Sequence, residues 1–263
     1  SRDTAGYYSE LSQRGGDHAR LPERVIMAAE SYQSEALANW EALHDHAYVI
    51  GDFVWSAIDY LGEAGIGRYY PPGEEPRKHW EGSMFPWHGA YCGDIDLTGW
   101  RKPASHFRNI VWDRGEKLYA TVLEPAPSGG AWGVTPWSLP PSLPSWTWPG
   151  EENKPLTIEV YSRHDAVRVS VNGRVVGEKP TTRAEGFKAV FTTPYEPGVV
   201  EISGLKAGKA VETRVLKTAS TAAALRLTAD RTQPVADGQD LVFVTVEALD
   251  AGGTWQPLAG PVV

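Results

Sequence analysis

The chain has 263 residues, enough for one large domain or for two to three small ones with a substantial core. The net charge of −8 at pH 7, with no basic block, argues against nucleic acid as a partner. No stretch approaches the roughly 20 apolar residues of a membrane-spanning helix, so a membrane is not expected as a partner either. The single cysteine, Cys92, cannot form an internal disulfide.

The first elements form a strand–helix–strand pattern. Residues 1–20 are polar, contain glycine and show no period, so we expect a loop. Residues 23–30 form a short apolar run without alternation, which is typical of a buried parallel strand. Residues 34–44 carry apolar residues at spacings of three and four, which predicts a helix with Ser34 as its N-cap. Residues 48–55 predict a second strand, and the three elements together indicate a βαβ unit.

A long irregular segment follows the second strand. Residues 62–98 are rich in Gly, Pro and aromatic side chains and show no period. Such long irregular segments in compact domains are usually functional. Pro103 then stands at the favoured first position of a helix that we expect from Ala104 to about Trp112.

After Arg114 the helical patterns end and short strands take their place. An Asn172-Gly173 pair between two alternating runs is a strong hairpin signal. Regular short strands with turns between them favour an immunoglobulin-like β-sandwich. Residues 218–225 are small and Ala-rich, as in a linker. The predicted strands are 118–123, 156–162, 167–171, 174–178, 187–192, 199–205 and 211–217, followed by 225–229 and 241–249 in a further β-domain.

Two residues at the ends of the first predicted strands suggest a sugar site. Glu30 ends the run Val25–Ala29, where a carboxylate is costly unless it is paired or has a chemical role. Trp55 ends the next run, and the apolar face of a sugar ring can stack on an indole. A carboxylate and a tryptophan at strand ends on either side of a helix suggest the rim of a (β/α) barrel.

Three segments of the chain resemble glycoside hydrolase family 2. They are A-A-E-S-Y (28–32), V-I-G-D-F-V-W-S-A-I-D-Y-L-G-E-A-G-I-G (49–67) and C-G-D-I-D-L-T-G-W-R-K-P (92–103). The resemblance is to the end of the catalytic barrel, and in particular to bacterial β-galactosidases with additional sandwich domains; it covers roughly residues 20–217. It implies that Glu30 is the nucleophile of a retaining glycosidase, with a structural salt bridge as its alternative. It also implies that Trp55 forms the floor of the sugar subsite, with packing in the barrel wall as its alternative.

The resemblance also implies a division into domains. Residues 1–114 would be the C-terminal part of a TIM-barrel glycosidase domain, residues 115–217 an immunoglobulin-like sandwich, and residues 218–263 part of a second sandwich of immunoglobulin or invasin type. The expected fold class is therefore α/β plus all-β, with the last strands and helices of a (β/α)8 barrel. With only two barrel strands expected in this chain, six would lie upstream, so we expect an internal piece of a larger polypeptide.

Four further residues are candidates for sugar contacts, each with an alternative. Tyr32 could hydrogen-bond the nucleophile or serve only in packing. Asp59 and Glu63 could accept hydrogen bonds from sugar hydroxyls, or they could pair with Arg68 or Arg101. His88 is a further candidate, because it lies between Trp87 and Gly89 in the aromatic segment.

The acid/base partner of the nucleophile is not found in this sequence. In the family it is the Glu of an Asn-Glu pair, and none of the four asparagines here (Asn39, Asn109, Asn153 and Asn172) precedes a Glu. We therefore expect the partner upstream, and this chain alone to be inactive. No metal and no cofactor are expected: the histidines lack zinc-site spacing, and Asp94 and Asp96 favour structural hydrogen bonding over Ca²⁺. The group Trp132, Trp137, Trp146 and Trp148 either packs domains together or binds sugar.

The resulting hypothesis is part of a retaining exo-β-glycosidase that hydrolyses terminal β-galactosides, with the rest of the barrel as its partner. A related β-glucuronidase or β-mannosidase stays open. The rival class is a non-catalytic carbohydrate- or protein-binding module. We expect a periplasmic or secreted location, with the cytoplasm as the alternative.

Overall fold

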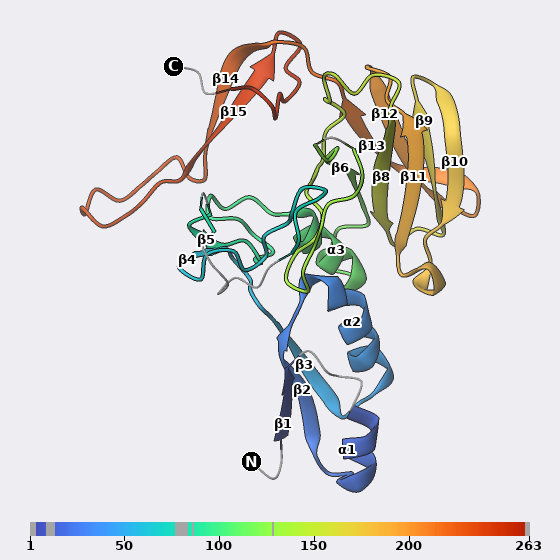
Figure 1. Cartoon of the computed structure of the whole chain (residues 1–263), viewed down its shortest axis with the longest axis vertical. Coiled ribbons are helices and arrows are strands. Elements are labelled where there is room, and N and C mark those ends of the chain that lie inside the picture. The colour runs from blue at the N-terminus through green and yellow to red at the C-terminus, as the bar shows by residue number, and fades with distance from the viewer. Residues whose placement is uncertain (1–3, 9–13, 77–83, 86, 128, 261–263) are drawn as a thin grey trace.

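The computed structural model describes residues 4–8, 14–76, 84–85, 87–127 and 129–260 (Figure 1). Its N-terminal part is a three-stranded parallel sheet in the order β1-β2-β3. The strands are β1 (Thr4–Tyr8), β2 (Val25–Ser31) and β3 (Val49–Val54), with α1 (Arg14–Arg20), the 3-10 turn η2 (Gln33–Glu35) and α2 (Ala36–Asp45) between them. Ile26, Ala28, Ala42 and Val49 pack α2 onto the sheet.

The loop expected for residues 1–20 is wrong, because β1 and α1 occupy much of that range. Neither element carries a strong local signal. β1 is a five-residue strand that contains Gly6 and is stabilised by parallel pairing with β2, and α1 contains Gly15 and Gly16 and buries no residue. The chain therefore contributes three parallel strands rather than the expected two.

Both predicted helices are present. α2 begins at Ala36, after η2, and its N-cap residue is Glu35, so the prediction of Ser34 as the cap is wrong. The 3-10 turn moves the helix start past Ser34. α3 (Pro103–Val111) has Pro at its first position, as predicted.

The segment between β3 and α3 is largely irregular, as expected. It contains two two-residue strands, β4 (Tyr60–Leu61) and β5 (Gly89–Ala90), which pair with each other. A small core of Ile66, Ala90 and Cys92 holds the described part of it together, with Tyr60 and Trp137 packed against this core. Part of the predicted irregular range, 77–83 and 86, lies outside the described residues.

Two four-stranded sheets with a shared core form a β-sandwich (Figure 1, green through yellow to orange). Valines of β9 and β12 from one sheet and residues of β6, β8 and β11 from the other fill that core. The sheet orders are β10-β9-β12-β13 and β11-β8-β6-β7. The strands are β6 (Leu118–Leu123), β7 (Ser142–Leu143), β8 (Pro155–Ser162), β9 (Ala166–Val171), β10 (Arg174–Pro180), β11 (Lys188–Pro194), β12 (Val199–Lys206) and β13 (Lys209–Lys217).

The four tryptophans between β6 and β8 serve packing, which is the structural alternative. Trp146 and Trp148 are buried in the sandwich core, and the Trp146 indole donates to the Glu196 carbonyl at 2.9 Å. Trp132 packs edge-on against Tyr69, with ring centroids 5.1 Å apart. Trp137 packs against the small core of the irregular segment. The first pair thus stabilises the sandwich, and the other two attach the irregular segment to it.

The sandwich is anchored to the helices of the N-terminal part. Trp40 of α2, Ile110 and Val111 of α3, and Tyr161 and Phe187 of the sandwich region form one apolar cluster. The Arg163 guanidinium donates to the carbonyls of Ile110 and Val111, the last residues of α3. A cation at these carbonyls is favourable, because they lie at the negative end of the helix.

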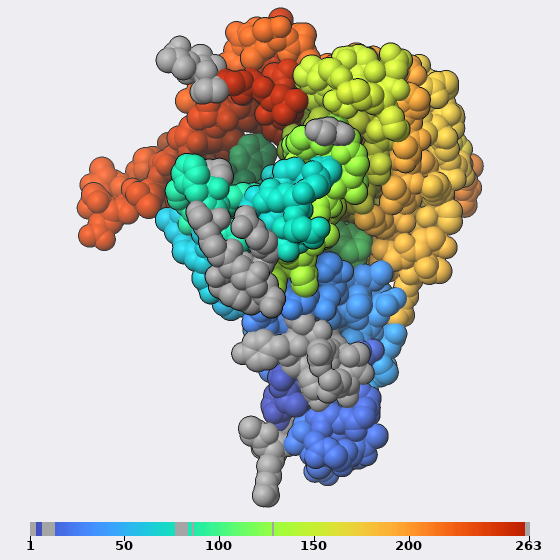
Figure 2. Space-filling model, in the orientation of Figure 1, coloured from blue at the N-terminus to red at the C-terminus, as the bar shows by residue number. Residues whose placement is uncertain are grey.

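A two-stranded antiparallel hairpin ends the described chain. It consists of β14 (Ala222–Ala229) and β15 (Val244–Asp250), so the first strand begins three residues before the predicted Leu225. The hairpin extends from the body of the molecule (Figure 2, orange). Across the described residues, no helix is long and apolar enough to cross a membrane.

Candidate active site

A β-bulge in β2 sets the direction of Glu30. Ile26 and Ala28 are buried against α2, so regular alternation would place Glu30 on the same face. Instead, both neighbouring strands pass over one residue of β2: Tyr7 pairs with Ala28 and Tyr8 with Glu30, while Ala28 pairs with Asp52 and Ser31 with Val54. The next buried side chain is therefore Ser31, and Glu30 is turned to the opposite face of the sheet.

Ser31 joins a buried polar network on the helix side of the sheet. Its hydroxyl and the Asn39 amide both donate to Oδ1 of Asp52. Arg108 of α3 bridges two carboxylates, with Nη1 3.2 Å from Asp52 and Nε 2.7 Å from Asp94. This network connects β2, β3, α2 and α3 directly behind Glu30, so the backbone that carries Glu30 is held from two helices.

Trp55 directly follows β3, at the same end of the sheet as Glu30. Its backbone N–H donates to the Ser31 carbonyl at 2.9 Å, and its side chain is 39% exposed. The indole Nε1 donates to the Tyr60 hydroxyl at 3.0 Å, and that hydroxyl donates in turn to the Glu63 carboxylate. Burial, followed by the Glu63 carboxylate, raises the pKa of Tyr60, which keeps its hydroxyl protonated.

Tyr60 is a member of this site that the sequence did not indicate. It lies between the predicted strand that ends at Trp55 and the irregular segment that begins at residue 62, within the stretch 49–67 that carries the family resemblance. Glu63 is exposed, and its carboxylate accepts from Tyr60. The Tyr60 hydroxyl thus connects Trp55 and Glu63, two residues that the sequence predicted separately as sugar contacts.

Asp59 needs a correction, because the structure buries it. It lies 2.7 Å from Lys102 Nζ and also accepts a 2.7 Å hydrogen bond from the Gly93 N–H. Burial raises the pKa of Asp59 and lowers that of Lys102, while their hydrogen bond acts in the opposite direction on both. The alternative of an ion pair is thus the one observed, with Lys102 in place of Arg68 or Arg101. Asp59 has no exposed oxygen to offer a sugar, and we do not propose it as a contact.

Tyr32 and His88 have different surroundings. The Tyr32 ring packs edge-on against Trp137, with centroids 5.2 Å apart, which is the packing alternative. His88 is exposed and lines a cavity of about 420 Å³ together with Leu61, Trp87 and Leu97. His88 therefore stays available to a ligand.

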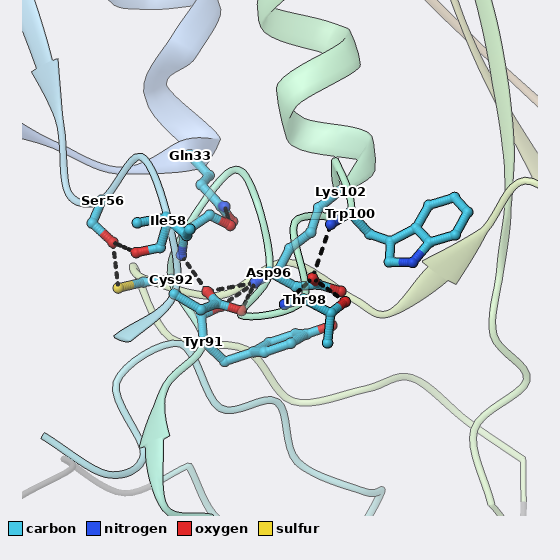
Figure 3. A network of polar contacts seen from close by, with 11 residues as sticks. Gln33, Ser56, Ile58, Tyr91, Cys92, Asp96, Thr98, Trp100 and Lys102 are labelled. Carbon is cyan, nitrogen blue, oxygen red and sulfur yellow. Dashed lines mark hydrogen bonds and ion pairs between the residues drawn. The ribbon is translucent and has the colours of Figure 1, made fainter. Parts of the chain in front are cut away.

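The two aspartates of C-G-D-I-D make structural hydrogen bonds and ion pairs, as predicted. Asp94 pairs with Arg108. Oδ1 of Asp96 accepts from the Thr98 N–H, the Thr98 hydroxyl and the Trp100 N–H, which fixes the turn that carries Trp100 (Figure 3). In the described part of the chain, no group of three or more His, Cys, Asp or Glu side chains is placed to hold a metal ion.

Known proteins resemble this chain over nearly its whole length. A solved structure of a glycosyl hydrolase family 2 member from Bacteroides cellulosilyticus is 37% identical, with a TM-score of 0.85 over 98% of this chain and 33% of that chain. The chain belongs to glycoside hydrolase family 2. Residues 153–212, in the sandwich of this family 2 chain, match the model of a domain of unknown function, DUF4982.

Two curated relatives carry different names. The β-galactosidase BoGH2A of Bacteroides ovatus is 29% identical over 84% of this chain and 21% of the relative. A putative β-glucuronidase of Formosa agariphila is 26% identical over 83% of this chain and 18% of the relative. The family 2 chain described here therefore spans only about a fifth of the length of these curated relatives.

Proposed function

We propose that the chain is part of a retaining exo-β-glycosidase in which Glu30 is the nucleophile. The observation that carries this proposal is the bulge in β2, which turns Glu30 away from the helices at the end of the sheet where Trp55, with an exposed indole, follows β3. Strand ends are rigid and hold a carboxylate well for attack on an anomeric carbon. We further propose that the three parallel strands belong to a (β/α)8 barrel and that its remaining strands lie in upstream sequence.

In the proposed reaction, the Glu30 carboxylate attacks the anomeric carbon and forms a covalent glycosyl-enzyme ester as the aglycone leaves. A general acid protonates the leaving oxygen, and the same group then activates the water that hydrolyses the ester. Trp55 would stack on the sugar, held by Tyr60 and Glu63. The general acid is assigned to the upstream part of the polypeptide.

Terminal β-galactosides are the proposed substrates. The name of BoGH2A supports galactose. A glucuronide would call for a free cation at the site. Among the described basic residues in the loops that follow Trp55, Lys102 is paired with Asp59 and Arg68 with Glu74. Neither of these two cations is therefore free to bind the carboxylate of a glucuronide. The name of the Formosa relative keeps a β-glucuronidase as the second candidate.

The test is Glu30→Gln in the longer polypeptide that contains this chain, with aryl β-galactoside, β-glucuronide and β-mannoside as substrates. We expect kcat for the accepted sugar to fall on the order of 10⁴-fold, because the nucleophile is lost. An activated 2-deoxy-2-fluoro glycoside of that sugar should label Glu30, as peptide mass mapping would show.

Glu23→Gln is the matched control, since Glu23 is an exposed carboxyl just before the same strand. It should leave kcat unchanged. If Glu30→Gln kept full activity while remaining folded, the non-catalytic binding module would be the correct reading.

A further inference from the structure

A second cavity, of about 670 Å³, lies where three parts of the chain meet. Its walls come from the loop before α3 and the start of that helix, from the Pro-rich segment and sandwich strands β8 and β11, and from the C-terminal hairpin. Residues that define it include Trp100, Phe107, Pro140, Tyr161, Glu159 and Trp255. Neither Glu30 nor Trp55 is among the residues lining it. Its volume falls within the range of about 300–1,000 Å³ that is usual for ligand sites.

Two indole rings form part of the apolar wall of this cavity. Trp100 and Trp255 lie nearly parallel, at 16°, with ring centroids 6.3 Å apart, although they are distant in sequence. The Trp100 side chain is 47% exposed, and its ring points away from the surrounding polar contacts (Figure 3). Trp255 is half-buried. An indole offers a flat apolar face with little conformational freedom, which suits the apolar face of a sugar ring.

The polar part of the wall suits hydroxyl groups. Asp96 uses Oδ1 for the turn, whereas its Oδ2 accepts no hydrogen bond from the described residues. The turn is closed by the Asp96 N–H, which donates to the Trp100 carbonyl at 2.8 Å. The free carboxylate oxygen and the indole are thus held in a fixed relation before any ligand arrives, which reduces the entropy lost on binding.

The charges in the wall favour a neutral ligand. Lys188 pairs with Glu159, Lys102 with Asp59, and Glu247 of the hairpin with Arg226. Arg101 is engaged by Ser105 and lies 3.6 Å from Glu116. The basic side chains in the described part of the wall are thus all engaged, so none is free to bind an anion. The second carboxylate oxygen of Asp96 would repel an anionic ligand.

We propose that this cavity binds a stretch of neutral oligosaccharide at a site separate from Glu30. The carbohydrate class rests on the proposed function, but binding here does not need the nucleophile. The site would hold a glycan chain on the molecule while its end is processed elsewhere.

The test is isothermal titration calorimetry of this 263-residue chain with soluble β-linked galacto-oligosaccharides. We expect Trp100→Ala and Trp255→Ala each to weaken binding by at least about tenfold, as removal of a central aromatic contact does. Asp96→Asn keeps the Oδ1 acceptor of the turn and replaces the free oxygen, so it should weaken binding several-fold.

Phe243→Ala is the matched control, because it removes an exposed aromatic side chain that does not line the cavity, and binding should persist in it. Circular dichroism and thermal unfolding would confirm that each variant is folded. Absence of binding by the unchanged chain would overturn the proposal, as would binding that Trp100→Ala leaves intact or that Phe243→Ala abolishes. Loss of turnover in Glu30→Gln is a separate result, so either proposal can fail alone.

Discussion

Tyr60 gives the proposed sugar platform its fixed orientation. Its hydroxyl accepts from the Trp55 indole and donates to Glu63, and its ring meets the indole edge-on with centroids 6.1 Å apart. An exposed indole would otherwise sample several rotamers. We therefore interpret Tyr60 as a positioning residue that acts through Trp55.

Tyr60→Phe should keep the ring and remove both hydrogen bonds. We expect kcat/KM of the longer polypeptide to fall by about tenfold, since two modest hydrogen bonds are lost while packing stays. Steady-state kinetics with the accepted aryl glycoside would measure this. Tyr69→Phe is the matched control, because the Tyr69 hydroxyl has no hydrogen-bond partner among the described residues; equal losses in both variants would contradict the role given to Tyr60.

The sequence could indicate some residues of the site and not others. Glu30 and Trp55 follow apolar runs, so their places at strand ends were predictable. The partner of Asp59 was not, because Lys102 is 43 residues away and only the folded irregular segment brings the two together. Nor could the bulge be predicted, since nothing in V-I-M-A-A-E-S distinguishes it from a regular strand.

Among the elements, α3 is tied to the parallel sheet by charge as well as by packing. Arg108 is the cation between the carboxylates of Asp52 and Asp94, whose side chains are 2% and 8% exposed. Removing one partner of a buried ion pair leaves the others uncompensated.

Arg108→Met should therefore destabilise the chain by about 3–5 kcal/mol, because two buried carboxylates lose their cation. Urea unfolding followed by circular dichroism would measure the change. Arg168→Met is the matched control: the Arg168–Glu178 pair is exposed on both sides and should contribute about 1 kcal/mol or less. Similar losses in the two variants would show that the buried network does not stabilise the fold.

A single type of substitution should have opposite effects in two elements. Gly173 ends the Asn172-Gly173 turn between β9 and β10 at φ +79°, so Gly173→Ala should cost about 1 kcal/mol or more. Gly16 lies inside α1 with open space around it, so Gly16→Ala should stabilise by up to about 1 kcal/mol. Thermal unfolding of both variants checks the signs, and a shift of the same sign in both would refute the argument.

The elements that the sequence predicted well have strong local patterns. The sandwich strands alternate, and Pro103 marks the start of α3. β1 and α1 were missed because their stability comes from pairing and from the rest of the fold rather than from propensity. The expected barrel and the immunoglobulin-like type of the sandwich stay predictions.

At the scale of the whole molecule, the chain covers a third or less of the length of each relative compared above. We expect the isolated chain to give no turnover of aryl β-galactoside, β-glucuronide or β-mannoside. The lack of a general acid is by itself expected to slow the departure of a poor leaving group by on the order of 100- to 10,000-fold.

A chromogenic assay of the purified chain, beside the longer polypeptide as positive control, measures this. Turnover of any of the three sugars that disappears in Glu30→Gln would contradict the expectation. It would place an acid/base within these 263 residues or in an associated chain.

The bulge in β2 makes Ala29 a residue that the strand register does not need. Both neighbouring strands pair as if β2 were one residue shorter, with Tyr8 opposite Glu30 and Val54 opposite Ser31. Deletion of Ala29 would therefore restore regular pairing and leave Glu30 on the open face and Ser31 beside Asp52. Insertion of one further residue next to Ala29 has no such matching register, so this part of the strand should tolerate the loss of a residue better than the gain of one.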